Sequence, residues 1–90
     1  MEFEWDEKKS IANKNKHMID FHTAMELWND KNRVEIQTVF PVENRSILIG
    51  KIHNKLWAAI FTRRENTIRI ISVRRARKKE TNLYEQKENS

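Results

Sequence analysis

The stretch SILIGKIHNKLWAAIFTRRENTIRIIS, residues 46–72, decides the fold class. Its apolar runs at 46–52, 56–62 and 67–72 are separated only by short polar connections. Runs of this length that are rich in isoleucine predict three consecutive strands, and links this short favour antiparallel pairing. An alternating run at 34–38 comes before them. Together these patterns predict a four-stranded antiparallel meander.

Helical patterns come before this sheet. Asp6 is expected to cap a polar helix over 7–16, and Asp20 to cap a second helix. The apolar stripe of the second helix, at i, i+3, i+4 and i+7, consists of Phe21, Ala24, Met25 and Trp28. Phe3 and Trp5 alternate with acids, which indicates a short strand or an extended lead-in. Pro41 is expected to end the first strand of the meander.

The C-terminal segment is predicted to form a closing helix over 73–86. One face of this helix would carry Val73, Ala76, Glu80 and Leu83. Two N-terminal helices, four antiparallel strands and one C-terminal helix make an α+β fold, with its helices expected on one face of the sheet. We expect a single domain over 1–86 and a frayed tail over 87–90.

Composition narrows the class of protein. The 90 residues include no cysteine and three scattered histidines, so a disulfide framework or a thiolate zinc site is excluded and a metal enzyme is not expected. The N-terminus lacks the pattern of a signal peptide, and the longest apolar run, 56–61, is too short to span a membrane. The only glycine is Gly50, which excludes glycine-rich nucleotide loops. A cytoplasmic protein is expected.

Positive charge is concentrated near the C-terminus. Between Arg63 and Lys79 lie eight Lys/Arg and one acid, Glu65, which gives +7. The rest of the chain carries ten Lys/Arg and twelve acids, or −2. Such a distribution is typical of a phosphate-binding surface.

The same segment contains residues suited to metal-free cleavage of an RNA phosphodiester. Glu80 and Tyr84 are helical neighbours that could move protons, and arginines could hold the phosphate. His17 could be a third proton carrier, or it could only complement the C-terminus of its helix. A solvated basic face with an Arg77–Glu80 surface ion pair, or plain phosphate binding, would give the same pattern.

Five motifs give the chain a recognisable signature. They are F-E-W-D at 3–6, N-x-x-K-H at 13–17, F-x-x-A at 21–24, Thr62-Arg63-Arg64, and I-R-I-I-S-x-R-x-A-x-x-x-E-x-x-x-Y at 68–84. Over nearly the whole chain this closely resembles the BrnT family of type II toxins. The resemblance implies a small RelE-like ribonuclease that arrests translation. It also implies a cognate ribbon-helix-helix antitoxin in a hetero-oligomer, expected to be 2:2, with operator DNA bound only through the antitoxin.

The family pattern matches six positions of this chain: His17, Arg64, Arg69, Arg74, Glu80 and Tyr84. The chain departs from it at Met18, where relatives usually have glycine, in the Glu65-Asn66 turn, where they often have glycine, and at Val73, where alanine is common.

We therefore predict a metal-independent endoribonuclease without a cofactor, which cuts through the 2′-hydroxyl. The predicted catalytic residues are Glu80, Tyr84, His17, Arg64 and Arg74. The predicted RNA-binding residues are Arg63, Arg69, Arg75, Arg77, Lys78 and Lys79. Two alternatives stay open: a non-catalytic nucleic-acid-binding module, or a regulatory partner whose basic face docks an acidic antitoxin.

Overall fold

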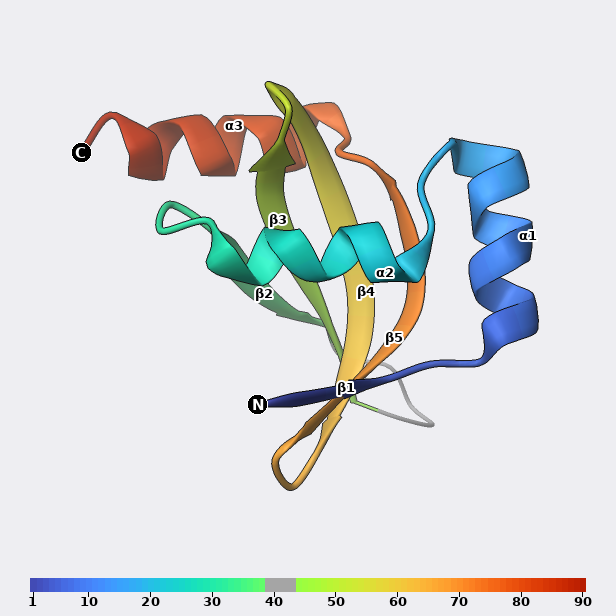
Figure 1. Ribbon diagram of the computed structural model, residues 1–90. Helices are drawn as coiled ribbons and strands as arrows, with labels where there is room; N and C mark the ends of the chain where they lie inside the picture. The colour runs from blue at the N-terminus through green and yellow to red at the C-terminus, as the bar shows by residue number, and fades with distance from the viewer. Residues whose placement is uncertain (39–43) are drawn as a thin grey trace.

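A computed structural model describes residues 1–38 and 44–90 of the chain. In chain order the elements are β1 (Glu2–Glu4), α1 (Glu7–His17), α2 (Phe21–Ala24), the 3₁₀ helix η1 (Met25–Asn29), β2 (Val34–Thr38), β3 (Arg45–Ile52), β4 (Lys55–Arg64), β5 (Thr67–Arg75) and α3 (Lys78–Glu88) (Figure 1). The predicted α+β class is confirmed. Pro41, which was expected to end the first strand of the meander, lies outside the described residues.

The sheet has five strands in the order β1-β5-β4-β3-β2. Strands β2 to β5 form the predicted antiparallel meander. The prediction of a purely antiparallel, four-stranded sheet is wrong, because β1 adds a parallel edge strand that pairs Phe3 with Ile68. The side chains of Glu4 and Arg69, 65 residues apart in the chain, meet in this pairing. No local pattern encodes a contact between such distant segments.

Strands β4 and β5 are longer than predicted. Arg63 and Arg64, expected in a connection, continue β4, and only Glu65 and Asn66 form the turn. Glu65 has a φ of 57°, in the left-handed region where glycine is favoured. This backbone would suit glycine, the residue that the family resemblance implies for this turn.

Helix α1 begins where its sequence predicts. Asp6 accepts a hydrogen bond from the Lys8 backbone N–H at 2.9 Å, and the helix continues one residue beyond the predicted end, to His17. Met18 then adopts a left-handed conformation with a φ of 68° and donates its N–H to the Lys14 carbonyl. Since only glycine takes this conformation at no steric cost, Met18 carries some backbone strain.

The second predicted helix starts at its expected cap but is wound more tightly than expected. The Asp20 side chain accepts a hydrogen bond from the Thr23 N–H at 2.7 Å, and after one α-helical turn the chain continues as η1. The fully buried residues of this stretch are Phe21 and Ala24 in α2 and Leu27 in η1, each three residues after the last. Met25 and Trp28 of the predicted stripe are only half-buried.

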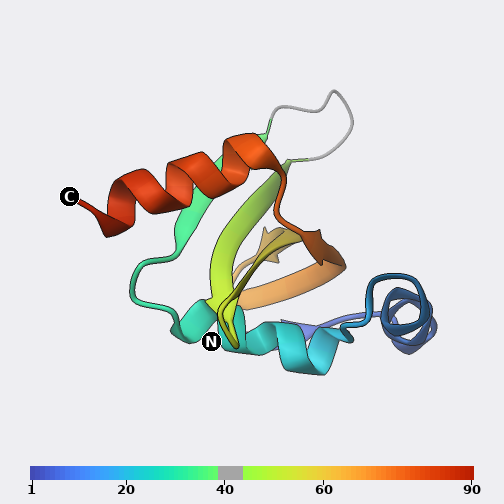
Figure 2. The same ribbon diagram turned by 90° about the horizontal axis from the view of Figure 1, so that it is seen from above.

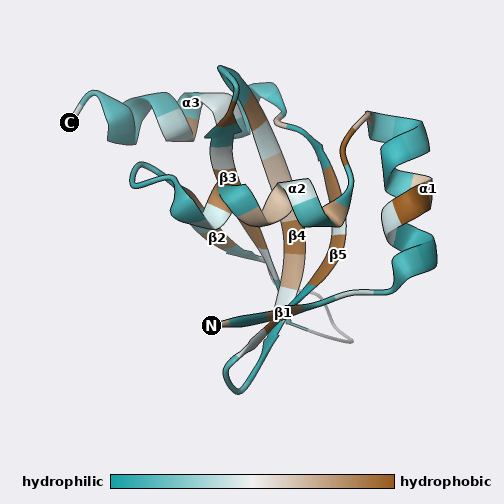
Figure 3. Cartoon of the chain, in the orientation of Figure 1, coloured by the Kyte–Doolittle hydropathy of each residue, from teal (hydrophilic) through white to brown (hydrophobic). Residues whose placement is uncertain are grey.

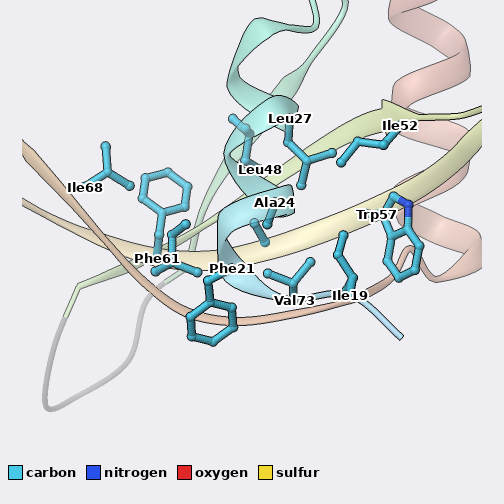
Figure 4. Close-up of a cluster of buried hydrophobic side chains, with 12 residues drawn as sticks. Ile19, Phe21, Ala24, Leu27, Leu48, Ile52, Trp57, Phe61, Ile68 and Val73 are labelled. Atoms are coloured by element: carbon cyan, nitrogen blue, oxygen red, sulfur yellow. The ribbon is translucent and has the colours of Figure 1, made fainter. Parts of the chain in front are cut away.

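One face of the sheet forms the main hydrophobic core with α2 and η1 (Figure 4). Gly50 and Trp57 are cross-strand partners on this face. A Cβ at Gly50 would come within 3.0 Å of the Leu27 side chain, so the glycine lets η1 approach β3 closely.

Helix α3 lies on the opposite face. Strand register places Val34, Ile49, Ala58 and Arg74 in one row, and residues paired across strands share a face. Arg74 bonds to Glu80 of α3, so α3 covers this row. Figure 2 shows the strands lying between α2 and α3. The expectation that all helices cover one face is therefore wrong.

The closing helix was predicted over 73–86, and its predicted start is also wrong. Val73, Arg74 and Arg75 extend β5, and α3 runs from Lys78 to Glu88. Pairing with β4 overrides the helical propensity of this segment. The expected buried face changes accordingly, because Leu83 is 41% exposed while Glu80 and Tyr84 are buried.

Candidate functional site

Three of the predicted cations form ion pairs with carboxylates of other elements. Arg69 bonds to Glu4 at 2.9 Å, and Arg63 bonds to Glu35 at 2.7 Å. The Arg63 guanidinium holds the pKa of Glu35 below its usual range. The third cation, Arg74, forms a two-pronged pair with Glu80 at 2.7 and 2.9 Å. A guanidinium that is bound to a carboxylate has fewer N–H groups available for a phosphate.

The Arg74–Glu80 pair is largely shielded from solvent. The exposed fractions of the two side chains are 19% and 10%. Glu80 also accepts a hydrogen bond from the Arg77 backbone N–H at 2.7 Å, which caps the start of α3. Hydrogen bonding to Arg74 is the main reason why the pKa of Glu80 is lowered. Glu80 is therefore a stable anion, and its structural role is to fasten α3 to β5.

Tyr84 lies one helical turn beyond Glu80, on the same buried face of α3. Its hydroxyl donates to Asp30 Oδ2 at 2.7 Å, and only 2% of the residue is exposed. Burial and the bond to Asp30 raise its pKa well above the ordinary value. Burial alone would raise the pKa of Asp30, but hydrogen bonds from Asn32, Tyr84 and Lys51 outweigh it and lower the pKa.

Helix α3 is thus held to the rest of the molecule mainly by polar contacts. Lys51 and Glu88 form an ion pair at 3.2 Å, and Lys87 Nζ donates to the Arg33 carbonyl at 2.6 Å. Figure 3 shows that α1 and α3 are mostly hydrophilic, whereas the strands carry the apolar residues. The position of α3 therefore depends on Glu80 and Tyr84.

Four of the predicted cations form a continuous group. Arg75 ends β5, and Arg77, Lys78 and Lys79 follow where α3 begins; all four are exposed. Within residues 1–38 and 44–90, none of the four forms an ion pair with a carboxylate. We call these residues the cationic segment.

Arg64 lies far from the cationic segment. It pairs with Thr67 at one end of β5, whereas Arg75 pairs with Trp57 at the other end. Thr67 and Arg75 are eight residue steps apart along β5, or roughly 26 Å. The predicted constellation is therefore divided between the two ends of the β4–β5 hairpin, with Arg69 between them.

His17 lies toward the same end of β5 as the cationic segment. Asn13, one helical turn earlier, bonds to both the N–H and the carbonyl of Val73, at 3.1 and 2.9 Å. Strand β1 pairs only with residues 67–69 of β5. Further along the same strand, the Asn13 side chain satisfies the backbone N–H and carbonyl of Val73. His17 continues α1 past Val73, so the fold brings it toward Arg75. The sequence motif at 13–17 included Asn13, but no pattern indicated that its amide would pair with a strand.

In the parts of the chain that the structure describes, no three His, Asp or Glu side chains are grouped as ligands of a metal ion. No helix in these parts has the length and apolar character needed to cross a membrane.

Comparison with known proteins identifies the family. No curated protein matches the chain. A family model described as ribonuclease toxin, BrnT, of type II toxin-antitoxin system matches residues 5–80. The match includes His17, Arg64, Arg69, Arg74 and Glu80, and it ends before Tyr84. Since it covers most of the chain, the protein belongs to the BrnT family of ribonuclease toxins of type II toxin-antitoxin systems.

Proposed function

We propose that this ribonuclease toxin cuts cytoplasmic RNA without a metal ion and thereby arrests translation. The 2′-hydroxyl attacks the adjacent phosphate and leaves a 2′,3′-cyclic phosphate or its hydrolysed 3′-phosphate. The observation that carries the proposal is the cationic segment, where a strand ends and a helix begins: its four exposed cations form no ion pair with a carboxylate of the described residues. Cations fixed on rigid elements can stabilise the charge that develops on a phosphate in the transition state.

The geometry favours different roles for the predicted proton carriers. The side chain of His17 makes no hydrogen bond or ion pair with any described residue, so its ring nitrogens are available to contact a substrate. The oxygens of Glu80 and the hydroxyl of Tyr84 are engaged within the fold. We therefore propose His17 as a proton carrier and Glu80 and Tyr84 as positioning residues. Arg64 is proposed to bind a more distant phosphate of the same RNA.

The test uses purified protein and single-stranded RNA in excess EDTA. We expect cleavage to continue, and to stop when the nucleotide at the cut carries a 2′-deoxyribose, because the nucleophile is then missing. The His17→Ala variant should be slower by about 10²–10⁴-fold while it still binds RNA. Lys16→Ala, an exposed neighbour on α1, is the matched control. Complete loss of activity in EDTA, or cleavage of the deoxy substrate, would reject this mechanism.

A second candidate function is RNA binding without cleavage. It is favoured by the engagement of Glu80 and Tyr84 in bonds within the fold, which leaves few free groups for acid–base chemistry. Salt-dependent binding of RNA together with intact RNA after long incubation would support this second function over the first.

We also propose that the cognate antitoxin is a ribbon-helix-helix protein, and that it covers the cationic segment in a 2:2 complex. Four exposed cations attract an acidic surface, and a bound antitoxin would exclude RNA from them. Hydrogen exchange of the complex should show protection at residues 75–79. Light scattering would give the stoichiometry. Unchanged exchange at these residues would mean that inhibition occurs from another surface.

A further inference from the structure

A small pocket lies between the α1–α2 link and the β3–β4 hairpin. Its volume is about 200 Å³. Three buried side chains, Ile19, Ile52 and Trp57, contribute an apolar floor. Met18 and Lys55, both exposed, stand at the rim. Figure 4 shows Ile19 beside the Trp57 indole, and the indole nitrogen on the side of Ile52.

The size and chemistry of this pocket suit one flat heteroaromatic ring. An apolar cavity of about 150 Å³ is sufficient to hold benzene. The pocket lining includes no carboxylate, and His53 and Lys55 supply polar groups at its mouth. The Trp57 indole N–H has no hydrogen-bond partner among the described residues, and its nitrogen retains access to solvent, so it can donate to a ligand. Bases of single-stranded RNA are recognised in this way, by aromatic contact and by hydrogen bonds to their edges.

The pocket is adjacent to the cationic segment. Trp57 is the cross-strand partner of Arg75, whose guanidinium lies 5.4 Å from the centre of the indole ring. Ala76 donates its N–H to the Leu56 carbonyl at 3.0 Å, which keeps the chain after β5 alongside the start of β4. A nucleotide whose phosphate is held by Arg75 would therefore have its base within reach of the pocket. His17 directly precedes Met18 at the pocket rim, so the proposed proton carrier is near the same nucleotide.

We propose that this pocket is a base-binding subsite, which holds one unstacked base of the RNA substrate while the cationic segment holds its phosphates. The inference rests on the proposed RNA-cleaving function for the identity of the natural ligand. Its direct test needs no cleavage, because mononucleotides contain both the base and the phosphate.

The test is titration of the isotope-labelled, folded protein with nucleoside 5′-monophosphates, monitored by NMR. We expect at least one nucleotide to shift the Trp57 indole N–H, the Met18 methyl group and the Thr23 amide. Ribose 5-phosphate should shift only amides of the cationic segment, since it lacks the base. If no nucleotide shifts the pocket resonances, or if ribose 5-phosphate shifts them equally, the inference is wrong. If the antitoxin shifts the pocket resonances and no nucleotide does, the pocket belongs to the antitoxin interface and the inference is also wrong.

Two variants test the subsite in RNA binding. Met18→Gly removes one wall of the pocket at a position whose backbone favours glycine, and we expect it to weaken binding of a non-cleavable 2′-O-methyl oligonucleotide about fivefold. Ile11→Ala, which removes an exposed apolar side chain from the same helix, should leave affinity unchanged. Lys55→Glu should also weaken binding, whereas the exposed Lys31→Glu should do so less. Unchanged affinity in both pocket variants would overturn the inference.

The base-binding subsite and the cleavage mechanism can be rejected independently. If RNA is not cut but nucleotides shift the pocket resonances, the subsite is supported and the cleavage mechanism is rejected. If RNA is cut in EDTA and the pocket resonances stay unchanged, only the subsite falls.

Discussion

Glu80 shows how one carboxylate can be committed to structure within a site that was predicted from chemistry. Both of its oxygens are bonded to Arg74, and one also accepts the Arg77 N–H. Sequence reasoning found the residues but not this pairing. In a continuous helix, residues 74 and 80 would point in different directions. They meet only because β5 ends at Arg75 and α3 starts at Lys78.

The variant Glu80→Gln should lower the free energy of unfolding at pH 7 by about 2 kcal/mol, because it leaves the guanidinium of Arg74 shielded and without its counter-ion. Since the folded pKa of Glu80 is depressed, its stabilising effect is present above the ordinary value of 4.5 and is lost as the pH falls through the folded pKa. Urea unfolding of both proteins should therefore show a gap that is constant near neutrality and narrows below about pH 4.5.

The exposed Glu85→Gln is the matched control for this variant and should change stability little.

The pH dependence of the cleavage rate distinguishes a positioning role of Glu80 from a role as general base. A positioning residue leaves the shape of the pH–rate profile unchanged, whereas loss of the base removes its acidic limb. Loss of that acidic limb in the Glu80→Gln variant would show that Glu80 is the general base after all.

Tyr84→Phe removes one hydroxyl and leaves Asp30 without one of its donors. We expect a loss of about 1 kcal/mol of stability at pH 7 and a cleavage rate close to normal for the folded protein. Because the folded pKa of Tyr84 is raised, its contribution is complete below the ordinary value of 10.0 and is lost as the pH rises above it. A double-mutant cycle with Asp30→Asn should show strong coupling in stability. A rate loss of 10²-fold or more at unchanged stability would make Tyr84 a proton donor.

At the scale of elements, the meander and the helix starts could be predicted because their signals are local. Alternation over 34–38 and the apolar runs identified β2 to β5, and Asp6 and Asp20 identified two helix starts. The pairing of β1 with β5 and the choice of face for α3 depend on contacts between distant segments. The division of the predicted constellation has the same origin, because β4 and β5 extend past their apolar runs and carry Arg64 and Arg75 to opposite ends.

The end of α1 allows a test at this scale. Met18→Gly should raise the free energy of unfolding by about 0.5–1 kcal/mol, because glycine adopts the φ of 68° without strain. The control Ala12→Gly, in the middle of the same helix, should lower it by about 1 kcal/mol. Thermal unfolding measures both effects. A destabilised Met18→Gly protein would mean that side-chain contacts of Met18 outweigh its backbone strain.

For the molecule as a whole, location and pairing decide what each charge can do. The sequence predicted one basic surface of +7 between Arg63 and Lys79. In the fold, Arg63, Arg69 and Arg74 are neutralised by carboxylates from β2, β1 and α3. Net charge can be counted from a sequence, but ion pairs between separate elements cannot. The free charge is therefore expected to act mainly from the cationic segment.

Two double variants with the same change in net charge test this division. Arg75→Gln with Arg77→Gln removes two unpaired cations, whereas Arg63→Gln with Arg69→Gln removes two that are already paired with Glu35 and Glu4. If phosphates bind the cationic segment, the first variant should bind all RNA sequences more weakly. Each lost phosphate contact should reduce the slope of log affinity against log salt by about 0.7 for single-stranded RNA. The second variant should keep nearly the parental slope, because Arg63 and Arg69 are engaged with carboxylates in the parental protein before RNA binds.

Fluorescence anisotropy of a labelled 2′-O-methyl oligonucleotide at several salt concentrations measures both slopes. Equal losses in the two variants would show that RNA responds to net charge alone, and a larger loss in the second would place the RNA near the β4–β5 turn, where Arg63 and Arg69 lie.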